Sequence, residues 1–188
     1  SLTSTGGTLS LGDVTNDGGT FSGSAGSFSI GNFTAVNNGS ISLNGISLTL
    51  NGDLNVSDGD ISTDTNTDIT LGADSTLTTV HAVNAGNLDL GGYTLTLGTG
   101  TPSLTVNTSV SGLNAATAGI VSYGSNLTLV PAFTASSGSR VSSSGGTMTL
   151  GDATFDGGSS LDISGTDLVL GGNLNTGSGS LTTDSSTD

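Results

Sequence analysis

The sequence predicts an all-β fold, a parallel β-helix (β-solenoid) of about nine turns with about twenty residues per turn. The first observation behind this prediction is a short apolar-x-apolar motif that returns along the chain, as in residues 9–11 (LSL), 48–50 (LTL) and 168–170 (LVL). The second is its period, because the last apolar residues of successive motifs are 19, 20, 21, 19, 20, 19, 21 and 20 positions apart. The third is that apolar residues alternate at a spacing of two, which is typical of strands and not of an amphipathic helix.

Each turn of the predicted coil follows one plan. In a strand, Leu48 and Leu50 point to one face and Thr49 points to the other. Two apolar side chains cannot bury themselves alone, so we expect the pairs of successive turns to lie over one another in a single column. A glycine usually follows the pair, where we expect a positive φ as the chain leaves the strand. The Asp or Asn beside it is expected to form the turn.

Additional apolar pairs indicate two or three short strands in each turn. At the usual spacing of parallel strands, nine turns would make a rod roughly 40–45 Å long. We predict a right-handed coil, because that is the usual hand of parallel crossovers. The additional pairs are Ile41 and Leu43, Leu54 and Val56, Leu95 and Leu97, and Leu161 and Ile163.

A longer repeat accompanies the short one. Residues 48–68 and 168–188 match at ten of twenty-one positions, at an offset of 120 residues or six predicted turns. The weakest stretch is 101–141, which contains a degenerate motif at 108–110 (TSV) and both prolines, Pro102 and Pro131. Because proline lacks the N–H that a ladder needs, we expect both in loops or at corners. We therefore predict one domain over residues 1–188, with an irregular turn or loop near 101–141.

Composition excludes several functional classes. The formal net charge is −14, all fifteen acidic residues are Asp, and the only basic side chains are those of Arg140 and His81. Such a surface disfavours nucleic acids and anionic membranes as partners. No apolar run approaches the ~20 residues that a membrane-spanning helix requires. The absence of Lys and the abundance of Ser and Thr favour an extracellular location, at a cell surface.

The densest acidic stretch is a weak candidate for calcium binding. Asp58, Asp60, Asp64 and Asp68 lie within eleven residues, and stacked carboxylates would repel one another unless a cation relieved them. The spacing matches no known calcium loop, and we expect no other cofactor. Other Asp and Asn residues recur after the apolar pair, where they are either turn formers or weak cation ligands. These are Asp13, Asn32, Asp53, Asp74, Asp152 and Asn173.

We predict that the chain is not an enzyme. Arg140 and His81 are far apart in the sequence, and neither belongs to a motif that would hold an acidic sugar or activate a serine. His81 is expected to be a surface residue.

The outward positions beside the apolar pairs form two predicted columns of small polar residues. They favour a solvated face, but they also allow a flat hydroxyl array that binds ice or a glycan. Asp68, Asp89 and Asp167 would interrupt such an array. The first column contains Thr8, Ser27, Ser47, Asp68, Asn87, Thr147 and Asp167, and the second contains Ser10, Ser29, Thr49, Thr70, Asp89, Thr128, Thr149 and Val169.

Residues 88–98 (LDLGGYTLTLG) and 145–152 (GGTMTLGD) resemble the rungs of large repetitive bacterial surface proteins. These include filamentous-haemagglutinin-type adhesins and autotransporter passenger domains. The resemblance covers most of the chain and implies an exported, right-handed β-helical stalk that acts in adhesion or matrix assembly.

The sequence thus leads to two functional hypotheses. The first is a structural, extracellular segment of a surface adhesin or filament, which associates end to end with itself or with flanking repeats of a longer chain. The alternative is an ice- or glycan-binding module that uses the Ser/Thr columns.

Overall fold

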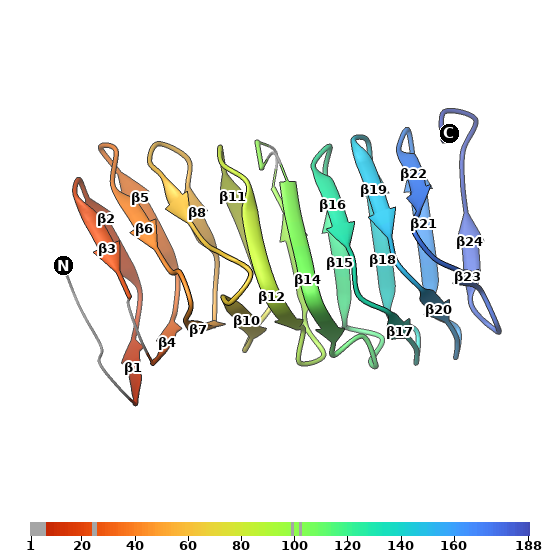
Figure 1. Cartoon of the computed structure of the whole chain (residues 1–188), viewed down its shortest axis with the longest axis horizontal. Coiled ribbons are helices and arrows are strands. Elements are labelled where there is room, and N and C mark those ends of the chain that lie inside the picture. Colours follow the sequence, from red (N-terminus) through yellow and green to blue (C-terminus); the bar gives the residue numbers. More distant parts are fainter. Residues whose placement is uncertain (1–6, 24–25, 99, 102) are drawn as a thin grey trace.

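The computed structural model describes residues 7–23, 26–98, 100–101 and 103–188. Within these residues the chain forms 24 strands and no helix. Successive strands coil around one axis and form a rod, with β1 near one end and β24 at the other (Figure 1). The predicted parallel β-solenoid of about nine turns is therefore confirmed. Its right-handedness stays a prediction.

Two long sheets run the length of the rod, and neighbouring strands within each are parallel. Sheet A contains β1 (Thr8–Leu11), β4 (Ser27–Ile30), β7 (Ser47–Leu50), β10 (Asp68–Leu71), β12 (Val83–Asp89), β14 (Ser103–Ser111), β16 (Asn126–Leu129), β19 (Thr147–Leu150) and β22 (Asp167–Leu170), in that order. Sheet B contains β2 (Val14–Asp17), β5 (Phe33–Val36), β8 (Leu54–Val56), β11 (Ser75–Thr79), β13 (Thr94–Leu97), β15 (Gly119–Ser122), β18 (Arg140–Ser144), β21 (Ser160–Ser164) and β24 (Ser180–Thr182).

Two short sheets complete the coil, one in each half of the chain. Each supplies the third strand of a turn, so a turn carries up to three strands, as the sequence predicted. Sheet C contains β3 (Thr20–Ser22), β6 (Ser40–Ser42) and β9 (Ile61–Ser62), and sheet D contains β17 (Phe133–Ala135), β20 (Ala153–Phe155) and β23 (Leu174–Asn175).

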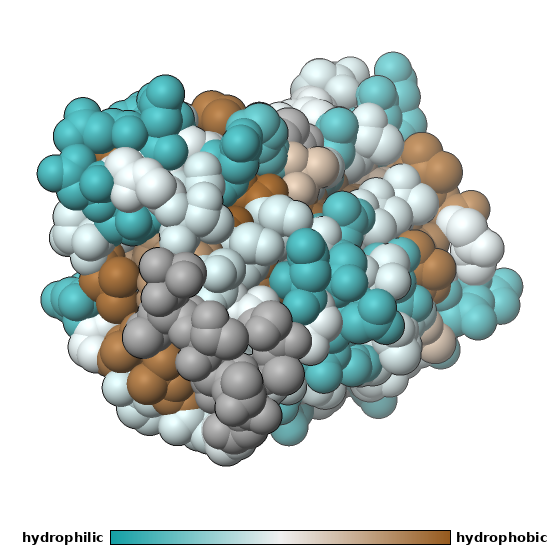
Figure 2. Space-filling model, turned by 60° about the vertical axis from the view of Figure 1, so that its left-hand side comes forward, coloured by the Kyte–Doolittle hydropathy of each residue, from teal (hydrophilic) through white to brown (hydrophobic). Residues whose placement is uncertain are grey.

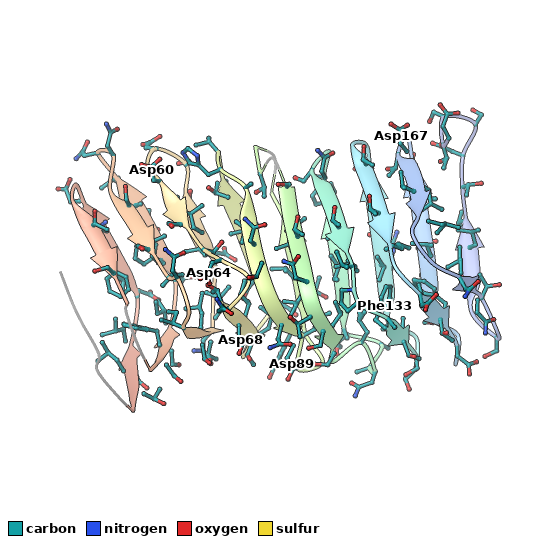
Figure 3. All side chains as sticks on the ribbon, in the orientation of Figure 1. Asp60, Asp64, Asp68, Asp89, Phe133 and Asp167 are labelled. Carbon is teal, nitrogen blue, oxygen red and sulfur yellow. The ribbon has the colours of Figure 1, made fainter. Side chains whose placement is uncertain are left out.

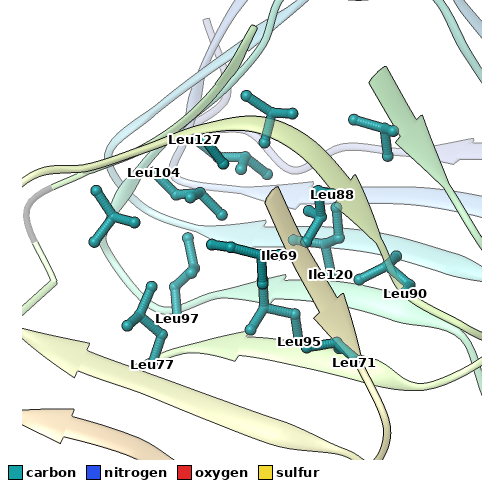
Figure 4. Packing of buried hydrophobic residues seen from close by; sticks show 14 of the residues in the cluster. Ile69, Leu71, Leu77, Leu88, Leu90, Leu95, Leu97, Leu104, Ile120 and Leu127 are labelled. Carbon is teal, nitrogen blue, oxygen red and sulfur yellow. The ribbon is translucent and has the colours of Figure 1, made fainter. Parts of the chain in front are cut away.

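The register places apolar residues over apolar residues. Leu48 pairs with Phe28 on one side and with Ile69 on the other, and Leu50 pairs in the same way with Ile30 and Leu71. These side chains are buried in one hydrophobic cluster. Figure 4 shows part of this cluster, with Ile69 and Leu71 among their buried neighbours. At about 25 cal/mol per Å² of apolar surface, this burial is the main favourable contribution to folding.

The apolar motif changes side within sheet A, which differs from the predicted single column. Strand β10 pairs with the second half of β12, where Ile69 faces Leu88. Strand β16 pairs with the first half of β14, where Leu127 faces Leu104. The long strands β12 and β14 connect the two halves, with a register shift between Ala85 and Asn87. The motifs before and after β14 therefore lie on neighbouring sides of the coil.

The physical reason is a mismatch between two periods. Paired residues are 22 apart at Leu88 and Val110 and 23 apart at Leu104 and Leu127, so one turn consumes more than twenty residues here. The motif itself still returns every 19 or 20 residues over this stretch. Because the motif period is shorter than the turn, the motif occurs earlier in each successive turn. After β14 it therefore lies on the preceding side of the coil.

The glycines after the apolar pairs serve more than one purpose. Gly91 has the expected positive φ of 57°, whereas Gly31, Gly52 and Gly172 lack a positive φ, so the expectation holds at only some of these corners. A Cβ on Gly52 would lie 2.5 Å from Oδ1 of Asn32 in the preceding turn, and one on Gly172 would lie 2.5 Å from Oδ1 of Asp152. Stacked turns therefore approach too closely there for any side chain.

Pro131 lies in the bend between β16 and β17, as predicted, while Pro102 lies outside the described residues. Buried hydroxyls at several corners bond to carbonyl oxygens of the preceding turn. Thr67 Oγ1 is 2.8 Å from the Leu43 oxygen, and Ser159 Oγ is 2.9 Å from the Ala135 oxygen. These two buried hydroxyls are satisfied in this way by the neighbouring turn.

Candidate functional site

Three of the four predicted calcium ligands have separate partners. Asp60 Oδ1 lies 2.9 Å from His81 Nε2, whereas Asp68 Oδ1 accepts a hydrogen bond of 2.6 Å from Asn87 Nδ2. Asp64 Oδ1 accepts the Gly45 backbone N–H at 2.9 Å. Asp58 is an exposed residue between β8 and β9.

Figure 3 places Asp60 near one long edge of the rod and Asp68 toward the opposite edge. Among the residues that the structure describes, no three His, Cys, Asp or Glu side chains gather as a metal-binding group. Calcium binding by Asp58, Asp60, Asp64 and Asp68 therefore stays a prediction.

Asp64 acts in the structure as part of a turn. The Gly45 N–H, with further bonds from Thr67 and Asn66, holds the pKa of the Asp64 carboxyl below its usual value. A carboxylate that accepts several hydrogen bonds is stabilised in its charged form without a cation. The same arrangement lowers the pKa of Asp184, mainly through the Ser164 hydroxyl.

The recurring Asp and Asn residues at the corners link consecutive turns. The Asn32 backbone N–H donates to Asp13 Oδ1 at 2.8 Å, and the Asp53 N–H donates to Asn32 Oδ1 at 3.0 Å. The Asn173 N–H likewise donates to Asp152 Oδ1 at 2.8 Å. Their role in turns is thus observed, but the bonded backbone belongs to the next turn and not to their own.

The side change divides the predicted hydroxyl columns. Thr8, Ser27, Ser47 and Asp68 face one another in consecutive strands, as predicted. Thr147 and Asp167 pair with each other on the neighbouring side of the coil. Figure 3 accordingly shows Asp68 and Asp89 toward one edge of the rod and Asp167 at the other. The alternative of an ice- or glycan-binding face would have to use two shorter arrays.

Both basic residues lie beside a carboxylate of a neighbouring turn. His81 faces Asp60, and Arg140 Nε lies 2.8 Å from Asp162 Oδ2. Sequence reasoning treated Arg140 as isolated. The separation of 22 residues, about one turn, was the signal that could have identified its partner.

The Arg140–Asp162 pair lies in a groove of about 530 Å³ on sheet B, which sequence reasoning missed. The groove crosses β15, β18, β21 and β24, and it was not predictable because its residues come from four turns. It is lined by Val121, Ser122, Tyr123, Arg140, Ser142, Ser143, Ser144, Asp162, Ile163, Ser164, Thr182, Thr183 and Asp184.

The last turn exposes side chains that are equivalent to the core of earlier turns. Leu170 is 46% exposed and Leu181 is 43% exposed, whereas Leu50 in the interior is only 2% exposed. At the opposite end, Leu9, Leu11 and Val14 are only partly buried. Figure 2, in which that end is turned forward, shows hydrophobic residues gathered there between mostly polar flanks.

No protein-family model, curated protein or solved structure matches this chain. Within the described part of the chain, no helical segment has the length and hydropathy that a membrane crossing requires.

Proposed function

We propose that this chain is a structural segment of an extracellular bacterial surface adhesin or filament, and that it associates end to end with a second copy of itself. The observation that carries the proposal is the continuous ladder of nine parallel strands in each of sheets A and B. Every turn is bonded to the next and buries a shared column of apolar side chains, which gives a stiff scaffold. The resemblance to repetitive surface proteins and the Lys-free, Ser/Thr-rich composition support the extracellular role.

The end of the rod offers a surface of defined pattern. Within the chain, Ile69 and Leu71 are the residues that sit on Leu48 and Leu50. Residues 168–170 repeat this apolar-x-apolar pattern on the exposed strand β22, and residues 9–11 supply a matching pattern on β1. The Leu168 N–H on the outer edge of β22 already donates to the Asp188 carbonyl oxygen at 2.8 Å. Strand β1 of a second copy could pair with the rest of this edge, since an unpaired strand edge is a template for another strand.

The proposal can be tested by sedimentation and negative-stain imaging of the 188-residue protein over a range of concentration and salt. We expect fibres or linear oligomers that lengthen as salt increases, because each copy carries a net charge of −14 and salt screens the repulsion between copies. Particles that stay monomeric at every concentration and salt would overturn end-to-end association.

Two matched variants locate the interface. Leu170→Asp places a charge on the inward side of β22, and Val169→Asp places the same charge on the outward side of the same strand. We expect Leu170→Asp to abolish association and Val169→Asp to leave it nearly unchanged. Equal association of both variants and the unmodified chain would exclude this end as the interface.

A further inference from the structure

We propose that the groove on sheet B binds a linear neutral oligosaccharide, with Tyr123 stacking on a sugar ring and the Arg140–Asp162 pair bonding its hydroxyls. This site lies apart from the Ser/Thr columns on sheet A, and it extends to the last turn of the rod at β24. It is carried by the shape of the groove, an exposed aromatic ring and the only guanidinium of the chain, all in one place.

The register defines the floor and the walls of the groove. Val121, Ser142, Asp162 and Thr182 are mutual neighbours in consecutive strands, and they form a row across sheet B. Ser142 is small and buried, so the surface of the sheet is recessed at the middle of this row. Tyr123, directly after β15, stands over one edge of the row, and Arg140 at the start of β18 stands over the other. The groove consequently has one long side chain at each edge, that of Tyr123 on one turn and that of Arg140 on the next.

Tyr123 presents a large apolar surface where the surroundings are polar. Its side chain is 53% exposed, and the neighbouring groove positions on the following turns are Ser144, Ser164 and Asp184. A half-exposed aromatic ring with an apolar body and a polar tip is suited to contact a ligand that is apolar on one face and hydroxylated at its rim. A pyranose ring has this character.

The Arg140–Asp162 pair supplies complementary hydrogen-bonding groups at the other wall. Asp162 engages the Nε–H, which is one of five N–H donors of a guanidinium. A carboxylate held beside a guanidinium offers acceptors and donors a few ångströms apart, which matches adjacent hydroxyls of a sugar. Ser160 Oγ, 3.1 Å from Asp162 Oδ2, helps to fix the carboxylate.

Charge selects a neutral ligand over an acidic one. The groove holds one guanidinium and two carboxylates, those of Asp162 and Asp184, within a chain whose net charge is −14. An anionic sugar would have to compete with Asp162 for Arg140. It would also be repelled by the negative electrostatic potential of the other carboxylates of the chain. The spacing of neighbouring turns, roughly 5 Å, is comparable with the length of one sugar unit in a linear chain, so several units can lie along successive turns.

The test uses the intrinsic fluorescence of tyrosine, because the chain has two Tyr and no Trp. In the Tyr93→Phe variant, the emission comes from Tyr123 alone. We would titrate this variant with linear neutral hexasaccharides (β-1,4-glucose, β-1,4-mannose, β-1,4-xylose and α-1,4-glucose) and with hexauronates of the same length. We expect a saturable change in emission with at least one neutral hexasaccharide and a weaker or no change with the hexauronates.

Calorimetry with the neutral hexasaccharide that binds most tightly then assigns the site. Tyr123→Ala should weaken binding about tenfold or more, as expected for the loss of one stacking contact. The matched control is Tyr93→Ala, which removes the other exposed tyrosine from a corner outside the groove and should leave affinity unchanged. Three results would each overturn the proposal: no neutral hexasaccharide binding with a Kd below about 1 mM, tighter binding of a hexauronate, or equal affinity of Tyr123→Ala and the unmodified chain.

Discussion

Residues 48–68 and 168–188 share ten of twenty-one positions, yet the coil uses them on different sides. The first copy runs through β7 in sheet A, β8 in sheet B and β9 in sheet C. The second runs through β22 in sheet A beyond the side change, β23 in sheet D and β24 in sheet B. Both copies therefore use all three sides of the coil but start on different sides, because the sequence requires only an adjacent strand of the same alternation.

The local structure of the two copies is nevertheless the same. Asp64 Oδ1 accepts the Gly45 N–H at 2.9 Å, and Asp184 Oδ1 accepts the Gly165 N–H at 3.1 Å. The following hydroxyl lies 2.9 Å from Oδ1 at Thr67, and 3.1 Å from the equivalent oxygen at Thr187. The hydrogen bonds of this corner, both within the turn and to the preceding turn, thus follow the residues themselves, whichever side of the coil they occupy.

Burial is what separates the copies, and it allows the largest predicted difference. Leu50→Asp would place a carboxylate between the buried Ile30 and Leu71, which should cost about 3 kcal/mol or more of the free energy of unfolding. Leu170→Asp should cost only about 1 kcal/mol, because much of that side chain is already in water. Chemical unfolding followed by circular dichroism would measure both. Equal losses would contradict the assignment of the two environments.

Thr49→Ala is the matched control for Leu50→Asp. Thr49 lies on the outward face of the same strand, between Ser29 and Thr70. Its truncation should change the free energy of unfolding by about 0.5 kcal/mol or less.

Engineered disulfides can test directly whether the apolar motif changes side, since the natural chain has no Cys. Thr105 and Thr128 are direct neighbours on adjacent strands, so Thr105→Cys with Thr128→Cys should oxidise nearly completely. The pair Ser109→Cys with Thr128→Cys, which an unbroken single column would favour, should keep free thiols. Titration of free thiols distinguishes the two outcomes. Cross-linking of the second pair alone would show that the motifs form a single column after all.

A smaller effect tests the close approach of stacked turns in both copies. A methyl group on Gly52 would meet Oδ1 of Asn32, and one on Gly172 would meet both Oδ1 and the backbone nitrogen of Asp152. Gly52→Ala should cost about 1–3 kcal/mol of the free energy of unfolding. Gly172→Ala should cost less, because the terminal turn can shift outward. Gly12→Ala is a suitable control, since a methyl group there would meet no atom within 4 Å.

The smallest expected effect is on acid stability. Hydrogen bonds, first of all from the Gly45 N–H at Asp64 and from the Ser164 hydroxyl at Asp184, lower the pKa of both carboxyls below the ordinary 3.8. A lowered folded-state pKa contributes stability above about pH 4 that is lost as the pH falls through the folded-state value. The thermal midpoint should therefore decline below about pH 4.

Asn substitutions separate this titration from the loss of hydrogen bonds. Asp64→Asn and Asp184→Asn retain an Oδ1 acceptor but cannot titrate. Each should reduce the acid-dependent part of the decline in the midpoint. A decline of unaltered steepness in both variants would assign the acid sensitivity to other carboxyls.

The sequence by itself determined the strand-forming alternation, the period near twenty residues, the burial of Leu48 and Leu50 and the place of Pro131 at a corner. These follow from local chemistry, because strand periodicity and turn preference depend on neighbours within a few residues. Only the tertiary structure decided which side of the coil each motif occupies. It also brings Asn32 too close to Gly52 for a side chain there, and it places Tyr123, Arg140 and Asp162 in one groove. Those features depend on how many residues each turn consumes, a quantity that the packing of one turn on the next sets and the motif spacing does not reveal.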